Sequence, residues 1–507
     1  MTFQQILQGA EVLAQSGDSE IQGIAYDSRQ VRPGFLFIAM RGESSDGNQF
    51  IDRALSAGAV AVVTDSAKEQ PRPGIAWAQA PHGRRALGRL SANFYKRPAE
   101  RLAITGVTGT NGKSTTTFLL ESILSAAGRK SILVGTIEYH VAGRALAAPH
   151  TTPESLELNQ MLAEGLGNGA TEAVMEVSSH ALAQQRVFAV PFDVAVFTNL
   201  TRDHLDYHHT MEEYFNSKRI LFEGCGTDAP RSVVINAEDE YGAKLEKFSK
   251  KAGSRVLTYG RTTGDFRAQN VQITAHGTRF DVETPDRKLA IFSPLIGRVN
   301  VYNILAAAAA ATARGCSGEA IEKGVAELLR VPGRFERVDC GQPFTVIVDY
   351  GHTDDALRNL TALAREFVTQ SGQKRRVITV FGCGGDRDRA KRPLMGDAAG
   401  QGSDFVVLTS DNPRSEDPLA IMNDAVVGLQ RSNAKYAMEP DRRRAIALAI
   451  GKAAAGDIVL IAGKGHEKVQ VSREGSVPFD DVRVAQEVLA TVGYECQAAK
   501  AGAGQPR

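Results

Sequence analysis

The segment GVTGTNGKST, at residues 106–115, constrains the fold more than any other part of the chain. It follows a short run of apolar and β-branched residues, and it leads into the stretch STTTFLLESILSAAG, whose apolar residues recur at helical spacing. A strand, a glycine-rich loop and a helix in this order are typical of a parallel α/β sheet. In such a unit the loop backbone and the helix N-terminus bind phosphate.

The side chains of this loop suit a nucleoside triphosphate. Lys113 can reach the terminal phosphates, and a hydroxyl group of Ser114 or Thr115 can bind magnesium. The strict phosphate-loop pattern has a glycine at the position of Val107, whereas this chain has Gly106 one residue earlier, so the loop is a variant. A tight turn that binds no nucleotide is the alternative, and the strand and helix around the loop argue against it.

Short β-branched runs, polar loops and helical stretches alternate in two series, one from Arg101 and one after Arg330. This alternation predicts βαβ units and parallel sheets. The 507 residues suffice for about three domains. We expect an α/β protein with a smaller mixed α/β domain at residues 1–98, a central parallel sheet with the phosphate loop at 99–331, and a C-terminal α/β domain at 332–507. The Pro- and Gly-containing segments KRPAE and RVPGRF support these boundaries.

The composition excludes several classes of protein. Lys and Arg number 59 against 58 Asp and Glu, for a net charge of +1, so we expect no binding to bulk nucleic acid. Five widely spaced cysteines without a CxxC pair predict reduced thiols. The first residues lack the positive segment of a secretion signal, and the longest apolar run, residues 304–313, is far shorter than the ~20 residues of a membrane span. We therefore expect a cytoplasmic protein without a membrane partner.

A second polar cluster, NLTRDHLDYHH at residues 199–209, holds three of the ten histidines. Glu176 ends the apolar run AVMEV, and its carboxylate could hold magnesium together with the imidazole of His204. A transition-metal site on His204 and His208, four residues apart on a helix, is the competing interpretation. For His208 and His209 a position on the solvent-exposed surface is the simplest expectation.

Lys218 stands at an unusual place in the stretch EEYFNSKRILFE. Tyr214, Leu221 and Phe222 lie four residues before it and three and four after it, so on a helix the lysine shares the apolar face. From the residues alone we expect the side chain to snorkel, with its ammonium group in water.

Three loops of the last region, GCGGDRDRAKRP, DNPRSEDP and AGKGHE, follow apolar strand-like runs. They bring together five polar residues, namely Arg387, Asp411, Asn412, Arg414 and Glu467. Arginines beside acids can bind an amino acid, because a guanidinium pairs with the carboxylate and a carboxylate pairs with the ammonium. Solvated loop charges are the alternative for each residue taken singly. Their recurrence at three strand ends favours a binding site.

These motifs together resemble the Mur ligase family. The matching segments cover nearly the whole chain and are DSRQVRPG (27–34), TGTNGKST, HTTPE (150–154), MEVSSHAL (175–182), DHLDYH, Lys218, GRVNVYN (297–303), PGRFE, GCGGDRDRAKRP, DNPR and GKGHE. The resemblance implies an N-terminal domain that holds a uridine nucleotide, a central ATPase domain and a Rossmann-like C-terminal domain that binds an amino acid.

The resemblance also implies a site for ATP and for magnesium as cofactor. Lys113, His204 and Lys218 would be catalytic, with Lys218 carbamylated so that an ammonium becomes a carboxylate able to bind a cation. Magnesium would be held by Ser114, Glu176, His204 and the carbamylated Lys218. ATP, as co-substrate, would contact Gly106, Thr108, Gly109, Thr110, Asn111, Gly112, Lys113, Ser114, Thr115, Asn300, Asn303, Arg334, Asp349 and His352. Gly351 and Asp354 depart from the Ala and Pro usual in the family, which predicts a looser loop on the ATP side.

The same resemblance implies sites for two further substrates. The UDP-muramoyl dipeptide would contact Ser28 at its uridine end and, farther along, Thr151, Thr152, Ser178, Gln184 and Arg186. The DNPR form is similar to that of the branch that adds meso-diaminopimelate. That amino acid would contact Arg387, Asp411, Asn412, Pro413, Arg414, Gly463 and Glu467. Arg414 can pair with the distal carboxylate, which lysine lacks, and such a difference can discriminate by roughly 10⁴-fold.

The implied reaction is an ATP-dependent ligation in cytoplasmic peptidoglycan precursor synthesis. It joins meso-2,6-diaminopimelate to the D-glutamate γ-carboxyl group of UDP-N-acetylmuramoyl-L-alanyl-D-glutamate through an acyl phosphate, and we expect a monomer. A lysine-adding Mur ligase and a folylpolyglutamate-type ligase are the enzymatic alternatives. A regulatory protein gated by its nucleotide is the alternative outside enzymes.

Overall fold

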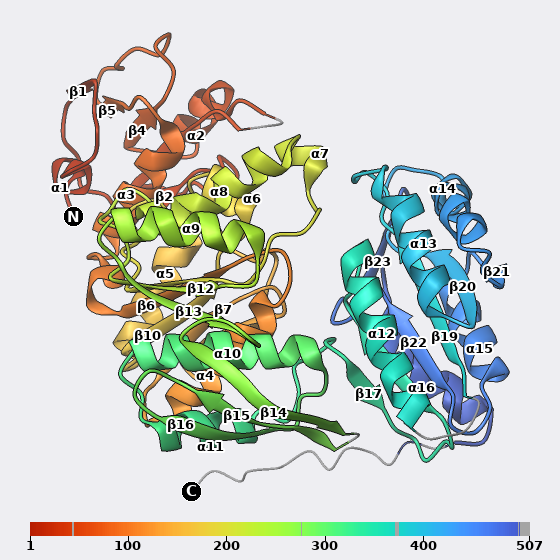
Figure 1. The fold of residues 1–507 in the computed structure, drawn as a ribbon. Helices are drawn as coiled ribbons and strands as arrows, with labels where there is room; N and C mark the ends of the chain where they lie inside the picture. The colour runs from red at the N-terminus through yellow and green to blue at the C-terminus, as the bar shows by residue number, and fades with distance from the viewer. Residues whose placement is uncertain (43–44, 275, 371–374, 495, 497–507) are drawn as a thin grey trace, which may run out of the picture.

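The computed structural model of the chain describes residues 1–42, 45–274, 276–370, 375–494 and 496. Three sheets, each with helices packed against it, follow one another along the chain (Figure 1). The predicted α/β class is therefore confirmed. The boundaries at residues 98 and 331 stay predictions.

The N-terminal unit is built on a five-stranded sheet in the order β1-β5-β4-β3-β2, in which β1 is antiparallel to its neighbour and the other pairs are parallel. Leu87 and Leu90 of α3 are buried against this sheet, and the same core includes Leu156 of the central unit. The elements are α1 (Phe3–Leu7), β1 (Ala14–Ser16), β2 (Gly23–Ala25), β3 (Phe35–Ala39), the 3₁₀ helix η1 (Gly47–Phe50), α2 (Ile51–Ser56), β4 (Ala61–Thr64), β5 (Ala76–Gln79), α3 (Gly83–Phe94) and the 3₁₀ helix η2 (Pro98–Arg101).

The central unit has an eleven-stranded sheet in the order β16-β15-β14-β13-β12-β11-β6-β10-β7-β8-β9. Its middle strands are parallel, and antiparallel strands extend both edges. The strands are β6 (Ala103–Thr108), β7 (Ser131–Val134), β8 (Glu138–Val141), β9 (Arg144–Ala147), β10 (Glu172–Glu176), β11 (Val194–Phe197), β12 (Ser232–Asn236), β13 (Arg255–Gly260), β14 (Phe266–Thr274), β15 (Gly277–Glu283) and β16 (Lys288–Ser293). The helices are α4 (Lys113–Ala126), α5 (Ser155–Gly167), α6 (Ser179–Ala183), α7 (Leu205–His208), α8 (Met211–Glu223), α9 (Glu240–Lys251), α10 (Arg298–Ala313) and α11 (Gly318–Glu327).

The alanine-rich run predicted to be too short for a membrane lies in α10. Its residues from 306 to 311 are fully buried against α4 and against strands β12 to β14. A helix that is apolar all round fits such an interior position, and small side chains let the neighbours approach closely. Within the part of the chain that the structure describes, no helix is long and apolar enough to cross a membrane.

The C-terminal unit has a six-stranded sheet in the order β17-β18-β22-β19-β20-β21, parallel except for β17. A separate two-stranded hairpin lies beside it. The elements are β17 (Glu336–Val338), β18 (Thr345–Asp349), α12 (Asp354–Gln370), β19 (Val377–Cys383), α13 (Lys391–Gly402), β20 (Phe405–Ser410), α14 (Pro418–Arg431), β21 (Tyr436–Met438), α15 (Arg442–Lys452), β22 (Ile458–Ala462), the hairpin strands β23 (Val469–Ser472) and β24 (Gly475–Pro478), and α16 (Asp481–Thr491).

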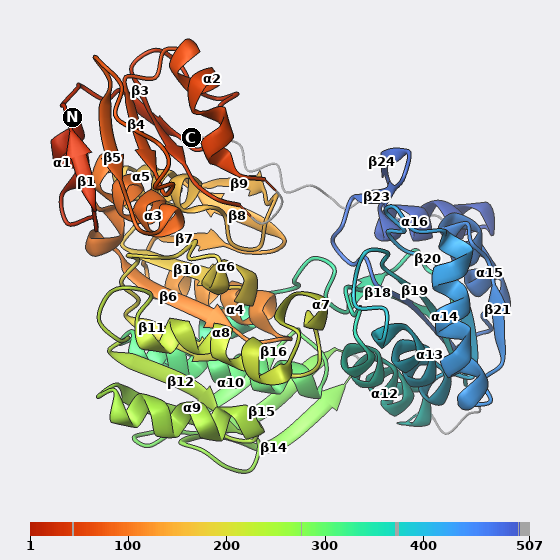
Figure 2. The same cartoon turned by 90° about the horizontal axis from the view of Figure 1, so that it is seen from above.

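The C-terminal unit stands beside the central unit, on the side to which α7 projects (Figures 1 and 2). The parallel strands of the central sheet place their carboxyl ends along one edge, and the loops that carry the predicted site residues begin there.

Two of the five cysteines differ from the expectation. Cys340, which follows β17, forms a disulfide with Cys496, so the prediction that all the thiols are reduced is wrong for this pair. Cys225, Cys316 and Cys383 are free and buried. Spacing along the chain could not indicate the pair, because 156 residues separate its members.

Candidate functional site

The phosphate loop joins β6 to α4 and depends on two glycines with positive φ. Gly109 has φ +148° and Gly112 has φ +89°, conformations that side chains rarely adopt. A Cβ atom on Gly109 would also collide with the hydroxyl group of Thr198, and one on Gly112 would collide with the amide of Asn303. The backbone of this loop can therefore approach its neighbours, and a phosphate, closely.

Lys113 opens α4 and folds back over the loop. Its Nζ donates to the carbonyl oxygens of Gly109 (3.1 Å) and Thr110 (2.9 Å). Burial, with a contribution from Arg334, lowers the pKa of Lys113. Next to it, Arg334 donates from Nη2 to Ser114 Oγ at 3.1 Å. Two cationic groups thus stand at the mouth of the loop, where a triphosphate needs them.

A cavity of about 490 Å³ opens over this loop. Most of the residues predicted for ATP line it, namely Thr110, Asn111, Gly112, Lys113, Ser114, Thr115, Asn300, Asn303, Arg334, Asp349 and His352. Gly106 and Thr108 lie in β6 instead, and together with Gly109 they are not among the lining residues. Gly106 and Thr108 thus belong to the strand that leads into the loop, and Gly109 belongs to the loop itself.

Gly351, one of the two departures from the family pattern, has a local structural role. Its N–H donates to Asp349 Oδ1 at 2.7 Å, and Phe335 N donates to Asp349 Oδ2 at 2.7 Å. Asp354 forms an ion pair with Arg358 one helical turn later. An alanine Cβ at position 351 would stand 3.0 Å from Asp349 Oδ1, so glycine leaves room for the carboxylate.

Two predicted magnesium ligands, Glu176 and His204, line the same cavity. Glu176 is fully buried at the end of β10, where it accepts hydrogen bonds from Thr136 N and Thr136 Oγ1, both at 2.8 Å. His204 precedes α7 with φ +54°, and burial lowers the pKa of His204 to about 3, so its imidazole is neutral. The Glu176 carboxylate and the Ser114 hydroxyl beside a phosphate loop are oxygen donors that fit magnesium, which takes part of its ligands from phosphate, and the His204 imidazole adds a nitrogen donor.

The competing transition-metal site is not formed. Both ring nitrogens of His208 are paired with hydroxyl groups, Nε2 with Ser179 Oγ at 2.9 Å and Nδ1 with Ser217 Oγ at 3.2 Å. Over the described ranges no three His, Cys, Asp or Glu side chains gather to hold a metal ion by themselves. His208 is buried, so its predicted surface position is wrong, whereas His209 is exposed as expected.

Lys218 does not snorkel, contrary to the expectation. Its side chain is 1% exposed on α8, Nζ donates to Gly109 O at 2.9 Å, and the ammonium lies 4.6 Å from the centre of the Tyr214 ring. Burial, followed by the nearby charge of Lys113, lowers the pKa of Lys218 well below its usual range. An amine in this state can lose its proton and act as a nucleophile.

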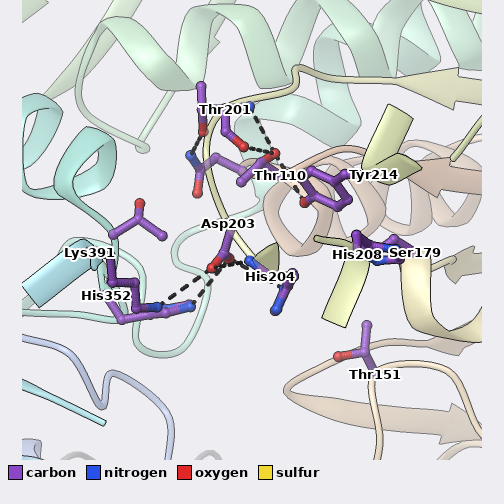
Figure 3. Close-up of polar contacts among 12 residues, drawn as sticks. Thr110, Thr151, Ser179, Thr201, Asp203, His204, His208, Tyr214, His352 and Lys391 are labelled. Atoms are coloured by element: carbon purple, nitrogen blue, oxygen red, sulfur yellow. Dashed lines mark hydrogen bonds and ion pairs between the residues drawn. The ribbon is translucent and has the colours of Figure 1, made fainter. Parts of the chain in front are cut away.

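Asp203 joins the central unit to the C-terminal one (Figure 3). Its carboxylate lies 3.3 Å from His204 Nε2, 3.5 Å from Lys391 Nζ and 3.8 Å from His352 Nε2. Burial opposes ionisation, yet His204, Lys391 and His352 together lower the pKa of Asp203 below its usual range. A second ion pair between the two units, Arg202 with Asp388 at 3.3 Å, lies beside it.

A second cavity, of about 460 Å³, lies between the two units. From the central unit it is lined by Thr151, Thr152, Ser178 and Arg186, and from the C-terminal unit by Arg387, Asp411, Asn412, Arg414, Gly463 and Glu467. Both predicted substrate sites therefore face one space. Six residues line both this cavity and the one over the phosphate loop, namely Thr151, Ser178, Asp203, His204, Tyr350 and His352.

Two of the predicted substrate residues lie behind the cavity wall. Gln184 Oε1 accepts from Arg186 Nε (3.0 Å) and Nη2 (2.7 Å), so it orients a residue that lines the cavity. Pro413 is buried between two lining residues. Ser28, predicted for the uridine end, is buried in the N-terminal unit and lines neither of these cavities. Arg29, the residue after Ser28, lines a third cavity of about 640 Å³.

Comparison with known proteins decides the family. Residues 20–95 match the Mur ligase family catalytic domain, residues 107–311 the Mur ligase middle domain and residues 333–465 the Mur ligase glutamate ligase domain. A protein of Solibacter usitatus named UDP-N-acetylmuramoyl-L-alanyl-D-glutamate–2,6-diaminopimelate ligase is 54% identical over 94% of this chain and 95% of its own length. The chain belongs to the Mur ligase family.

Other relatives of this Mur ligase agree. A protein of Geobacillus thermodenitrificans with the same name is 44% identical over 93% of the chain and 96% of its own length. A solved structure of a protein with that name, 34% identical, has a TM-score of 0.67 and covers 97% of this chain and 99% of its own. A folylpolyglutamate synthase of Mycobacterium tuberculosis is 19% identical, with a TM-score of 0.61 over 82% of this chain and 96% of its own, and shares the fold.

Sequence reasoning missed several residues of the Mur ligase site. Asp203 and Lys391 stand inside quoted motifs, RDH and AKRP, but only their contact across the two units singles them out. Tyr302 and Glu238 form a hydrogen bond at the edge of the nucleotide cavity, from segments with no shared motif. Such pairs leave no signal in a single sequence.

Proposed function

We propose that this Mur ligase joins meso-2,6-diaminopimelate to the γ-carboxyl group of D-glutamate in UDP-N-acetylmuramoyl-L-alanyl-D-glutamate. One ATP is converted to ADP and phosphate. The relatives at 54% and 44% identity carry the name of this reaction. The observation that carries the proposal is the shared wall of six residues between the nucleotide cavity and the interdomain cavity. Because the two cavities adjoin at these residues, ATP in one and a carboxylate in the other can lie close enough for phosphoryl transfer.

In the first step a γ-carboxylate oxygen attacks the γ-phosphorus of ATP, and the bond to the β-phosphate oxygen breaks. Phosphoryl transfer asks the protein mainly for positioning and charge neutralisation. Lys113 and Arg334 stand at the phosphate loop for this purpose, and Arg186 stands on the side of the muramoyl dipeptide. The product is an acyl phosphate, with ADP released.

In the second step the amine of diaminopimelate attacks the acyl carbon, the carbon–oxygen bond to phosphate breaks, and the nitrogen loses a proton. The amine must come from the C-terminal side of the interdomain cavity, where Arg387, Arg414, Asp411 and Glu467 stand. Closure of the two units around the acyl phosphate would exclude water, which otherwise hydrolyses it.

Magnesium, when bound, would neutralise phosphate charge and orient the triphosphate. Ser114, Glu176 and His204 would hold it, together with Lys218 after carbamylation. The neutral Lys218 amine would attack carbon dioxide, forming a nitrogen–carbon bond and losing a proton, so that a cation ligand replaces an ammonium. Burial supports this role, because it favours the neutral amine, and no carboxylate of the described residues forms an ion pair with Lys218. We further propose that the chain acts as a monomer in the cytoplasm.

Phosphate release tests the reaction. With ATP, magnesium and UDP-muramoyl dipeptide present, we expect release with meso-diaminopimelate and little with L-lysine. Equal rates would favour a lysine-adding enzyme over the proposal. Turnover of ATP without either substrate would instead favour a nucleotide-gated regulator. Arg414→Ala should lower the preference for diaminopimelate over lysine by about 10²-fold or more, since it removes the partner of the distal carboxylate.

A further inference from the structure

A second lysine, Lys464, is buried in the C-terminal unit and has no part in the steps above. It follows β22 in the loop AGKGHE, and its side chain is fully buried. Its Nζ donates to Asn412 Oδ1 at 2.8 Å and Glu467 Oε2 at 3.1 Å, and it lies 3.3 Å from Asp411 Oδ1. All three partners line the interdomain cavity, so Lys464 stands directly behind its wall.

Lys464 fixes the orientation of the Asn412 amide. Asn412 Oδ1 accepts from Lys464 Nζ and also from Val471 N at 3.0 Å. Because both of these groups are donors, the oxygen must face them and the amide nitrogen must face the other way. Nδ2 then donates to Glu467 Oε2 at 2.8 Å. One cation therefore sets the positions of an amide and a carboxylate of the wall.

The backbone around this cluster is held from behind. Arg442 is fully buried and pairs with Asp481 at 2.8 Å and 2.7 Å. Its guanidinium also donates to Ala462 O at 3.0 Å, two residues before Lys464. Gln470 Nε2 donates to Asp411 O at 2.7 Å. These hydrogen bonds hold the backbone before Lys464 and the neighbouring loop with Asp411, so the ammonium of Lys464 keeps its position.

The charge of Lys464 weakens the attraction of this part of the cavity wall for a ligand's ammonium group. Asp411 and Glu467 are acidic residues that line the cavity, and Lys464 forms an ion pair with one oxygen of each. A cation already present at this distance offsets much of their pull on a second ammonium group. A ligand with only an ammonium at its far end gains little, whereas one that also carries a carboxylate pairs with Arg414 or Arg387.

We propose that Lys464 is a positioning residue that acts as a resident counter-cation of the amino-acid pocket and makes the pocket select a zwitterionic end group over a lone ammonium. This inference rests on the proposed function and deepens it. It assigns discrimination against lysine-like substrates partly to a residue that never touches the substrate.

Lys464→Met tests the proposal in the full-length enzyme by steady-state kinetics with each substrate varied in turn. We expect the KM for meso-diaminopimelate to rise about 10- to 100-fold, because Asn412 and Glu467 lose the charged donor that positions them. The preference for meso-diaminopimelate over L-lysine should fall about tenfold, because the freed acids attract a lone ammonium. The KM values for ATP and UDP-muramoyl dipeptide should stay within about twofold, since none of the residues predicted to contact them is a partner of Lys464.

Lys468→Met is the matched control, because Lys468 follows in the same segment, is exposed and pairs only with Asp480 among the described residues. It should keep both the KM and the selectivity. Unchanged selectivity in Lys464→Met, or an equal rise in all three KM values, would overturn the proposal in favour of a purely structural role. If Lys464→Met does not fold, Lys464→Gln and Lys464→Arg decide: the arginine variant must keep the selectivity that the glutamine variant loses. A wild-type enzyme that fails to use meso-diaminopimelate would contradict the proposed function instead.

Discussion

Two lysines of the described residues are less than 2% exposed, one in the central unit and one in the C-terminal unit, and their surroundings differ in charge. Lys218 of the central unit meets the Gly109 carbonyl and the Tyr214 ring, and no carboxylate of the described residues forms an ion pair with it. Lys464 of the C-terminal unit meets two carboxylates and an amide. Burial is equal, so the partners decide what each lysine can do.

Without an acidic partner, burial penalises the charged form and the amine becomes available for chemistry. With two acidic partners, the lysine forms ion pairs and organises its neighbours. We therefore propose that the predicted nucleotide side of the enzyme holds a reactive lysine and that the predicted amino-acid side holds a structural one. Four predictions test this contrast, from the largest expected effect to the smallest.

Replacing Lys218 should abolish activity without unfolding the protein. We expect Lys218→Ala to lower kcat about 10³-fold or more, since a group that stabilises charge in the transition state is lost. Acetate or formate should restore part of the activity by standing in for the carbamate. Phosphate release measures both effects. Arg219→Ala, on the exposed side of the same helix, is the control and should remain active. If the Lys218→Ala enzyme were active, Lys218 would not be the reactive lysine of this pair.

Much of the site could be predicted because parallel strands bring their carboxyl ends to one edge. The loops with Lys113, Glu176, Asp411 and Glu467 were predicted at strand ends, and they line the two cavities. Lys218 was predicted to reach water, and this was wrong because its burial depends on Gly109, a residue 109 positions away. A helical face shows which side is apolar, but not what packs on it.

The structural lysine depends on the buried ion pair behind it, so breaking that pair should cost stability. We expect Arg442→Met to lower the free energy of unfolding by about 3 kcal/mol, because Asp481 is left buried and unpaired. Urea unfolding followed by circular dichroism measures the change. The neighbouring Arg443→Met removes an exposed pair with Glu487 and should change stability by less than about 0.5 kcal/mol. Equal effects of the two variants would argue against a rigid support for the pocket.

Asp203 connects the central unit to the C-terminal unit, and its loss should lower kcat moderately. Asp203→Asn keeps the shape but removes the charge that draws Lys391, so we expect about a tenfold lower kcat. Lys391→Met should have a similar effect, and the double variant should be little worse than either single one, because both remove the same contact. Steady-state kinetics of the four enzymes form the cycle, with the exposed Glu212→Gln as control. Additive effects would mean that the two residues act separately.

The smallest effect concerns the pH dependence of stability on the Lys218 side. Burial lowers the pKa of His208 to about 4, below the usual value of 6.5. Between these values the unfolded chain binds a proton that the folded chain does not, so stability is present above pH 6.5 and falls as the pH drops toward 4. From pH 7.5 to about pH 5.8 we expect His208 to cost the wild type about 1 kcal/mol. His208→Gln should lose less stability over this interval in thermal unfolding, whereas the exposed neighbour His209→Gln should behave as the wild type. An identical pH dependence in all three proteins would show that this side of the cavity tolerates a buried positive charge, and the contrast between the two lysines would then need a cause other than burial.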